Sequence, residues 1–117
     1  MIDFRDEKDF VTFSAGDTIF SEGDLGNIMY GVVSGEVELL AGRKYLATVR
    51  ENEIFGEMVL IDSRQRSATA VAVSDVVLAQ VTKEIFLGYI GENPKFALKV
   101  MSTLAGRLRV ESKMRSL

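Results

Sequence analysis

The residues best suited to chemistry lie in one short segment, residues 55–69. Gly56 is followed at once by an acid, Glu57, and Arg66 lies nine residues further along, before a strand-like sequence. A glycine turn that leads into a short helix directs backbone N–H groups toward one place, which favours an anion. A guanidinium can donate paired hydrogen bonds to a phosphate, and a carboxylate can accept hydrogen bonds from a diol. The segment therefore suits a sugar phosphate.

A purely structural interpretation of the same residues stays open at this point. Glu57 and Arg66 could form a surface ion pair, which contributes only about 0–1 kcal/mol to stability. Gly56 would then be an ordinary turn, and the segment would have no ligand.

The composition excludes several classes of catalytic site. The 117-residue chain contains no cysteine and no histidine, so disulfides, thiol catalysis, histidine general bases and zinc sites built from these residues are ruled out. No paired carboxylates and no lysine arrangement suited to catalysis stand out. We therefore expect a binding module with no catalytic residues, no metal site and no cofactor, rather than an enzyme of jelly-roll type.

Length and hydropathy indicate one domain over residues 1–117, because domains of about 100–150 residues are the most common. The apolar share of 47% excludes intrinsic disorder, and no run approaches the ~18 apolar residues of a membrane span. Residues 1–6 lack a basic stretch followed by an apolar one, so we expect no secretory signal and a cytoplasmic protein.

Charge is distributed unevenly along the chain. Residues 94–117 contain six basic side chains and one acidic side chain, whereas residues 1–93 contain eight basic and 16 acidic ones. A basic terminal segment could bind nucleic acid. A helix with a solvated lysine and arginine face is the simpler interpretation, and we expect no DNA binding by this chain.

Glycine-containing turns divide residues 10–82 into short runs with the alternation typical of strands. Many short, regularly spaced strands predict an antiparallel sandwich or barrel, and a jelly roll is the most economical form. We therefore expect a mainly β fold, an antiparallel β-roll or jelly-roll barrel followed by C-terminal helices. The expected strands are Val11–Phe13, Thr18–Phe20, Ile28–Val33, Val37–Ala41, Tyr45–Arg50, Ala68–Val73 and Val76–Thr82.

Residues 83–117 predict a short helix and a long one. Thr82 is a suitable N-cap for a helix from Lys83 to about Ile90, which Gly91 would end. Asn93 and Pro94 form a second helix start, because proline at the first helical position needs no backbone donor. The helical pattern then continues to Leu117.

This long helix carries an apolar stripe, which Val100 and Leu104 widen. The stripe could pack against the roll or pair with the same helix of a second subunit. A roll of this size leaves little core for the helix to cover, so we expect a two-fold homodimer. The residues of the stripe are Leu98, Met101, Ala105, Leu108 and Ser112.

Residues 55–69 resemble the phosphate-binding cassette of the cyclic nucleotide-binding domain family, which includes the bacterial catabolite activator and the regulatory subunits of cyclic AMP-dependent kinase. The family pattern is Phe-Gly-Glu-Leu-(Ala/Gly)-Leu, a variable stretch, then Arg-(Ala/Ser/Thr)-Ala. Phe55-Gly56-Glu57-Met58-Val59-Leu60 and Arg66-Ser67-Ala68-Thr69 match it, and the turns at residues 15–24 and 33–37 are also similar. The resemblance covers about residues 10–117.

The resemblance implies a role for each matching position. Glu57 would bind the ribose 2′-hydroxyl, and Arg66 would pair with the cyclic phosphate. Arg64 lies two residues out of register, and Val59 replaces a small residue beside the phosphate. The implied phosphate and ribose residues are Phe55, Gly56, Glu57, Met58, Arg66, Ser67 and Ala68.

Further positions correspond to the pocket wall and the base. Leu39, Ala47 and Val49 would line the pocket, and Arg107 and Ser112 match the residue types with which the activator's helix reaches the base. Glu111 departs from that pattern, since the activator has a hydroxyl there. Serine at position 67 also occurs in the activator, which uses cAMP, so the resemblance implies cAMP as the ligand, with cGMP as the alternative.

The resemblance implies a sensor in which nucleotide binding repositions the helix from Pro94 and alters a homodimer or partner contact. The effector is expected to be another, unknown protein, unless this chain is a piece of a longer one. The main alternative is a degenerate β-roll that serves as a protein-interaction or dimerisation module and binds no nucleotide.

Overall fold

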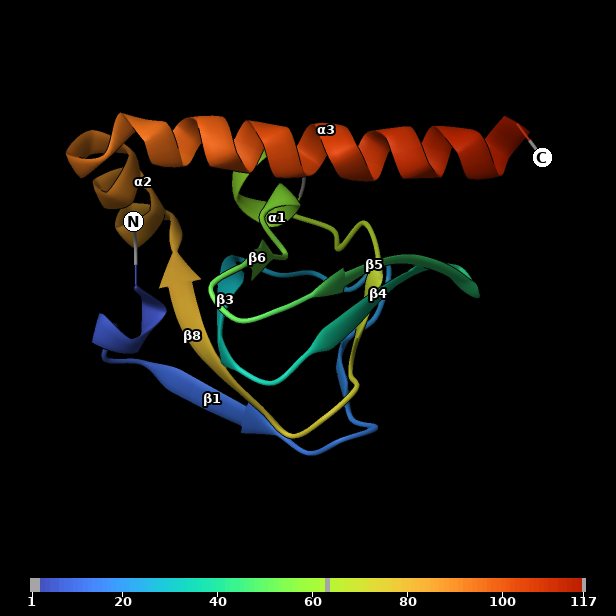
Figure 1. Cartoon of the computed structure of the whole chain (residues 1–117), viewed down its shortest axis with the longest axis horizontal. Coiled ribbons are helices and arrows are strands. Elements are labelled where there is room, and N and C mark those ends of the chain that lie inside the picture. Colours follow the sequence, from blue (N-terminus) through green and yellow to red (C-terminus); the bar gives the residue numbers. More distant parts are fainter. Residues whose placement is uncertain (1–2, 63, 117) are drawn as a thin grey trace.

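The computed structural model describes residues 3–62 and 64–116, with side chains described up to residue 110. Eight strands, one 3-10 helix and three α-helices make up this part of the chain (Figure 1). The strands are β1 (Phe10–Phe13), β2 (Thr18–Phe20), β3 (Ile28–Ser34), β4 (Val37–Ala41), β5 (Lys44–Val49), β6 (Ile54–Phe55), β7 (Thr69–Ala72) and β8 (Val76–Thr82). The helices are η1 (Phe4–Asp6), α1 (Met58–Ile61), α2 (Lys83–Glu92) and α3 (Pro94–Ser116).

The strands form two four-stranded antiparallel sheets, in the orders β1-β8-β3-β6 and β2-β7-β4-β5. The sheets face each other but do not close into a barrel, so the fold is a β-roll with C-terminal helices, as the turn spacing predicts. No helix in the described ranges is long and apolar enough to cross a membrane.

The main core lies between the two sheets and follows from the alternation along the strands. In β4, for example, Val37 and Leu39 are buried while Glu38 between them is not. Burial of apolar surface at about 25 cal/mol per Å² makes this the principal stabilising contribution. The buried members of the cluster include Val32, Val37, Leu39, Val49, Phe55, Ala70, Ala72, Val76 and Leu78.

The predicted strands agree with the observed ones to within one residue at each end. Two short elements were not predicted, namely η1 and β6. A strand of two residues such as Ile54–Phe55 is too short to show alternation, and its pairing with Tyr30 and Gly31 of β3 depends on tertiary contacts.

The short helix begins as predicted but ends later. The Thr82 hydroxyl accepts a hydrogen bond from the Ile85 amide at 3.3 Å, the expected N-cap contact. The prediction that Gly91 ends the helix is wrong, because α2 continues through Gly91 to Glu92. A glycine in a helix costs only about 1 kcal/mol relative to alanine. The break comes at Asn93, where the following proline disfavours helical backbone, and α3 begins at Pro94.

Helix α3 lies across one end of the roll and extends beyond it (Figure 1). Its first half packs on a second core cluster: Phe96 and Val100 are buried there with Phe4 from η1, and Leu104 packs against the same cluster. The expectation that α3 has little core to cover is therefore wrong for this half. In the predicted stripe, by contrast, Leu98, Met101 and Leu108 are 61–66% exposed. Its last member, Ser112, lies outside the described side chains.

Candidate functional site

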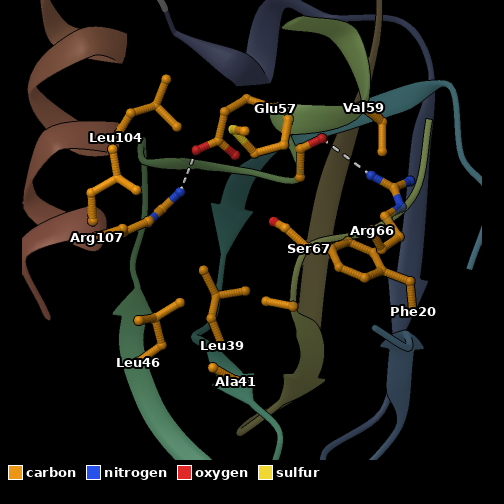
Figure 2. A pocket seen from close by; sticks show the side chains of 14 residues that line it. Phe20, Leu39, Ala41, Leu46, Glu57, Val59, Arg66, Ser67, Leu104 and Arg107 are labelled. Carbon is orange, nitrogen blue, oxygen red and sulfur yellow. Dashed lines mark hydrogen bonds and ion pairs between the residues drawn. The ribbon is translucent and has the colours of Figure 1, made fainter. Parts of the chain in front are cut away.

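A pocket lies between β4, β5, the two ends of the predicted cassette and α3 (Figure 2). It encloses about 700 Å³, including the space open to solvent. Of the predicted binding residues, the pocket is lined by Leu39, Gly56, Glu57, Met58, Arg66, Ser67, Ala68 and Arg107.

Gly56 makes the turn that brings the first half of the cassette to the pocket. Its φ of +76° lies in the left-handed region, which glycine adopts without the steric cost of a side chain. The chain then enters the short helix α1, where the Leu60 amide donates to the Glu57 carbonyl at 3.0 Å. The turn thus sets the Glu57 side chain into the pocket wall and leaves the Gly56 carbonyl near Arg66.

Arg66 is the cation at one end of the pocket, and its side chain is almost fully buried. Its Nη1 donates to the Gly56 carbonyl at 3.1 Å. Its backbone is held by the turn after β2, since the Arg66 amide donates to the Asp24 carbonyl at 2.7 Å and the Gly23 amide donates to the Arg66 carbonyl at 2.8 Å. This loop pairing fixes where the guanidinium enters the pocket.

The Arg66 guanidinium donates a hydrogen bond to a carbonyl but makes no ion pair with the described residues. Burial lowers the pKa of Arg66, while Tyr30, Asp24 and Glu57 nearby raise it. An arginine keeps its proton in either case. A buried charge without a partner is costly, so this position favours an anionic ligand.

Glu57 lies across the pocket and pairs with a different arginine. Its carboxylate, only 3% exposed, accepts a hydrogen bond from Arg107 Nη1 at 2.6 Å (Figure 2). Arg107 Nη2 donates to the Ile54 carbonyl at 2.8 Å. The alternative ion pair between Glu57 and Arg66 is therefore absent. Arg107, the residue predicted to approach a base, lines the pocket and ties α3 to the cassette.

An apolar wall separates these two charged groups from the rest of the roll. It takes residues from β4, β5 and α3, which meet at this end of the molecule (Figure 2). Such a surface suits a flat, weakly polar ring system better than a second charged group. The apolar residues that line it are Leu39, Ala41, Leu46, Leu104 and Leu108.

Three predicted site residues do not line the pocket. Val49 and Phe55 are core residues, each at most 1% exposed. Ala47 packs at the edge of the same core because β4 and β5 change register between Leu39 and Leu40. The bulge leaves Leu46 without a partner across the ladder, and this residue lines the pocket instead of Ala47.

The remaining predictions concern two further residues of the cassette. Arg64 is exposed and does not line the pocket. Val59 is buried and lines it, next to the position expected for a phosphate. The sequence gives no local signal that Phe20, Ala41 and Leu46 line the pocket, because their positions there depend on strand pairing. Leu104 and Leu108 were recognised only as members of a helix stripe.

These features define a β-roll domain with a pocket lined by a buried arginine and a buried glutamate. A protein-family model described as "Cyclic nucleotide-binding domain" matches residues 10–93, well over half of the sequence. The chain therefore belongs to the cyclic nucleotide-binding domain family, whose members are regulatory ligand-binding domains.

Relatives with similar sequence and structure agree with this assignment. The Cyclic AMP receptor protein of Thermus thermophilus is 42% identical over 102 residues, which are 83% of this chain and 47% of that protein. The crystal structure of the Thermus thermophilus Catabolite Activator Protein has a TM-score of 0.73 at 37% identity, over 91% of this chain and 52% of that one. The cAMP-bound form of the EAL enzyme Bd1971 has a TM-score of 0.65 at 38% identity, over 92% and 30%. This chain spans about half the length of the Thermus proteins.

Proposed function

We propose that this chain is a cytoplasmic sensor domain that binds a cyclic nucleotide, with cAMP as the preferred ligand and no catalytic activity of its own. The observation that supports this most directly is the buried Arg66 guanidinium, which has no carboxylate partner in the described ranges and lies across a pocket from Glu57. A cyclic phosphate would supply the missing anion, and the ribose would lie toward the carboxylate.

Each part of the ligand has a matching group in the pocket. Arg66 pairs with the phosphate, helped by the backbone at Gly56, Met58, Ser67 and Ala68, and the Glu57 carboxylate accepts a hydrogen bond from the ribose 2′-hydroxyl. The base lies against the apolar wall formed with α3. The name of the Thermus relative supports cAMP, and Bd1971, found in cAMP-bound and cGMP-bound forms, supports a cyclic nucleotide in general.

Titration calorimetry with cAMP, cGMP and 5′-AMP tests this function. A cyclic mononucleotide that gains about 0.3–0.4 kcal/mol per non-hydrogen atom would bind with near-micromolar affinity. We expect cAMP to bind more tightly than cGMP, and 5′-AMP to bind much more weakly. Absence of both heat and thermal stabilisation at millimolar cAMP and cGMP would contradict the proposal and favour the module without a ligand.

The Arg107 contact suggests how binding would be transmitted. Glu57 accepts a hydrogen bond from α3 through Arg107, and the same carboxylate is the expected acceptor for the ribose. A ligand shifts a conformational equilibrium only as far as it binds one conformer better. Arg107 and the ribose therefore either compete for the Glu57 carboxylate or bind it together. In both cases the nucleotide is linked to the position of α3, and through α3 to an effector protein.

The exposed stripe on α3 supports a homodimer as the second part of the proposal. Leu98, Met101 and Leu108 remain 61–66% exposed, and apolar side chains at this spacing pack well between two helices. We expect the parent to sediment as a dimer. Met101→Glu would place two charges in that contact and shift the protein to monomer at micromolar concentration.

Lys99→Glu is the control for this experiment. It places a carboxylate at an exposed position about 160° round the helix from Met101, away from the stripe. Analytical ultracentrifugation measures the mass of all three proteins. A dimer that survives Met101→Glu, or is lost equally in Lys99→Glu, would contradict pairing through this stripe.

A further inference from the structure

We propose that Phe20 and Gly26 form a slot that positions the Arg66 guanidinium for its anion. This inference deepens the proposed function and rests on it for the identity of the anion. Neither residue belongs to the cassette: Phe20 ends β2, and Gly26 lies in the connection to β3. Both act on a ligand through Arg66, so they are positioning residues.

The Phe20 ring supplies the first side of the slot. The Arg66 Cζ atom lies 4.1 Å from the ring centroid, within the range of a cation–π interaction. The Phe20 ring is held in place by two other aromatic rings. Its centroid lies 6.2 Å from that of Tyr30 and 5.9 Å from that of Phe55. An aromatic face attracts the guanidinium without neutralising it, unlike a carboxylate, so the N–H groups stay available for a phosphate.

The backbone of Gly26 supplies the second side. A Cβ atom added to Gly26 would lie only 2.6–2.7 Å from the Nε, Cζ and Nη2 atoms of Arg66. Gly26 is not among the glycines with positive φ, so the requirement for glycine here comes from the closeness of the guanidinium. The Gly26 amide donates to the Arg64 carbonyl at 2.8 Å, which anchors this backbone beside the cassette.

Gly56 closes a third side and fixes the orientation of the guanidinium. Its carbonyl accepts the hydrogen bond from Arg66 Nη1, and an added Cβ would approach that nitrogen to 2.9 Å. Contacts within the protein thus fix the planar group, with Phe20 beside it (Figure 2). Preorganisation of this kind raises affinity because less freedom is lost on binding.

The test compares Phe20→Leu with Phe20→Tyr, which keeps an aromatic face. We expect Phe20→Leu to weaken cAMP binding about tenfold, and Phe20→Tyr to weaken it by less than about threefold. In the Arg66→Ala background, Phe20→Leu should cause no further loss, because its effect passes through Arg66. An equal loss in both backgrounds would show that Phe20 contacts the ligand directly or only supports the fold, and would overturn the proposal.

A second measurement needs no nucleotide and so separates this proposal from the function. The Arg66 Hε resonance should be shifted upfield by the ring in the parent and in Phe20→Tyr, and this shift should be lost in Phe20→Leu. Gly26→Ala, which leaves the aromatic core intact, should also displace the resonance. Unchanged Hε positions in Phe20→Leu and Gly26→Ala would overturn the slot. Failure of the parent to bind cAMP despite the shifts would overturn the proposed function instead.

Discussion

Replacing Arg66 by alanine is expected to weaken cAMP binding by about a hundredfold or more. A hydrogen bond to a charged group contributes about 1.5–3 kcal/mol, and a guanidinium can donate two such bonds to one phosphate. Each 1.4 kcal/mol is a factor of ten in affinity. No other described arginine lies where it could replace Arg66, because Arg107 is engaged with Glu57 and Arg64 is exposed outside the pocket.

Calorimetry and ligand-induced thermal stabilisation together measure this loss. Arg64→Ala is the matched control: it removes an arginine two residues away that does not line the pocket, and its affinity should equal that of the parent. Arg66→Lys should give an intermediate affinity, since lysine keeps the charge without the paired donors. Equal stabilisation of the parent and Arg66→Ala by cAMP would mean that a different group holds the phosphate.

The strands could be predicted closely because their signals are local. Turn glycines such as Gly35 and Gly42 and the alternation around Val37 and Leu39 are visible within a few residues, and the two sheets follow from them. The end of α2 could not be predicted in the same way. Gly91 is a weak helix breaker, and the Asn93–Pro94 junction provides the stronger stop.

In the candidate site, too, only the features with a local sequence signal could be predicted. The turn at Gly56, the acid beside it and Arg66 are adjacent in sequence or in one segment, so their placement in one pocket could be anticipated. The wall could not, because the bulge between Leu39 and Leu40 selects Leu46 over Ala47. One inserted residue reverses which side chains face inward, and no local pattern records it.

The partner of Glu57 is the other feature that depends on tertiary structure. Arg107 is 50 residues away in sequence, and only the docking of α3 through Phe96 and Val100 brings it to the pocket. The pair is well shielded, with side-chain exposures of 3% for Glu57 and 17% for Arg107. It therefore joins the cassette to the long helix more firmly than a surface ion pair would.

Arg107→Met is accordingly expected to destabilise the protein without ligand by about 3 kcal/mol, because it leaves the buried Glu57 carboxylate without its cation. For a domain of this size the midpoint of thermal unfolding should fall by roughly 10 °C. Methionine keeps most of the apolar stem of the side chain, so loss of packing contributes little. Arg109→Met is the control: it changes an exposed arginine two residues after Arg107 on α3, and it should leave the midpoint unchanged.

The double variant Glu57→Gln with Arg107→Met isolates the interaction from the cost of an unpaired charge. We expect it to be more stable than Arg107→Met alone, since no buried carboxylate remains, which makes the two substitutions strongly non-additive. Urea unfolding of the parent, Glu57→Gln, Arg107→Met and the double variant gives this coupling free energy directly. Simple additivity would mean that Glu57 is solvated when Arg107 is absent, and that α3 is held by Phe96 and Val100 without help from the cassette.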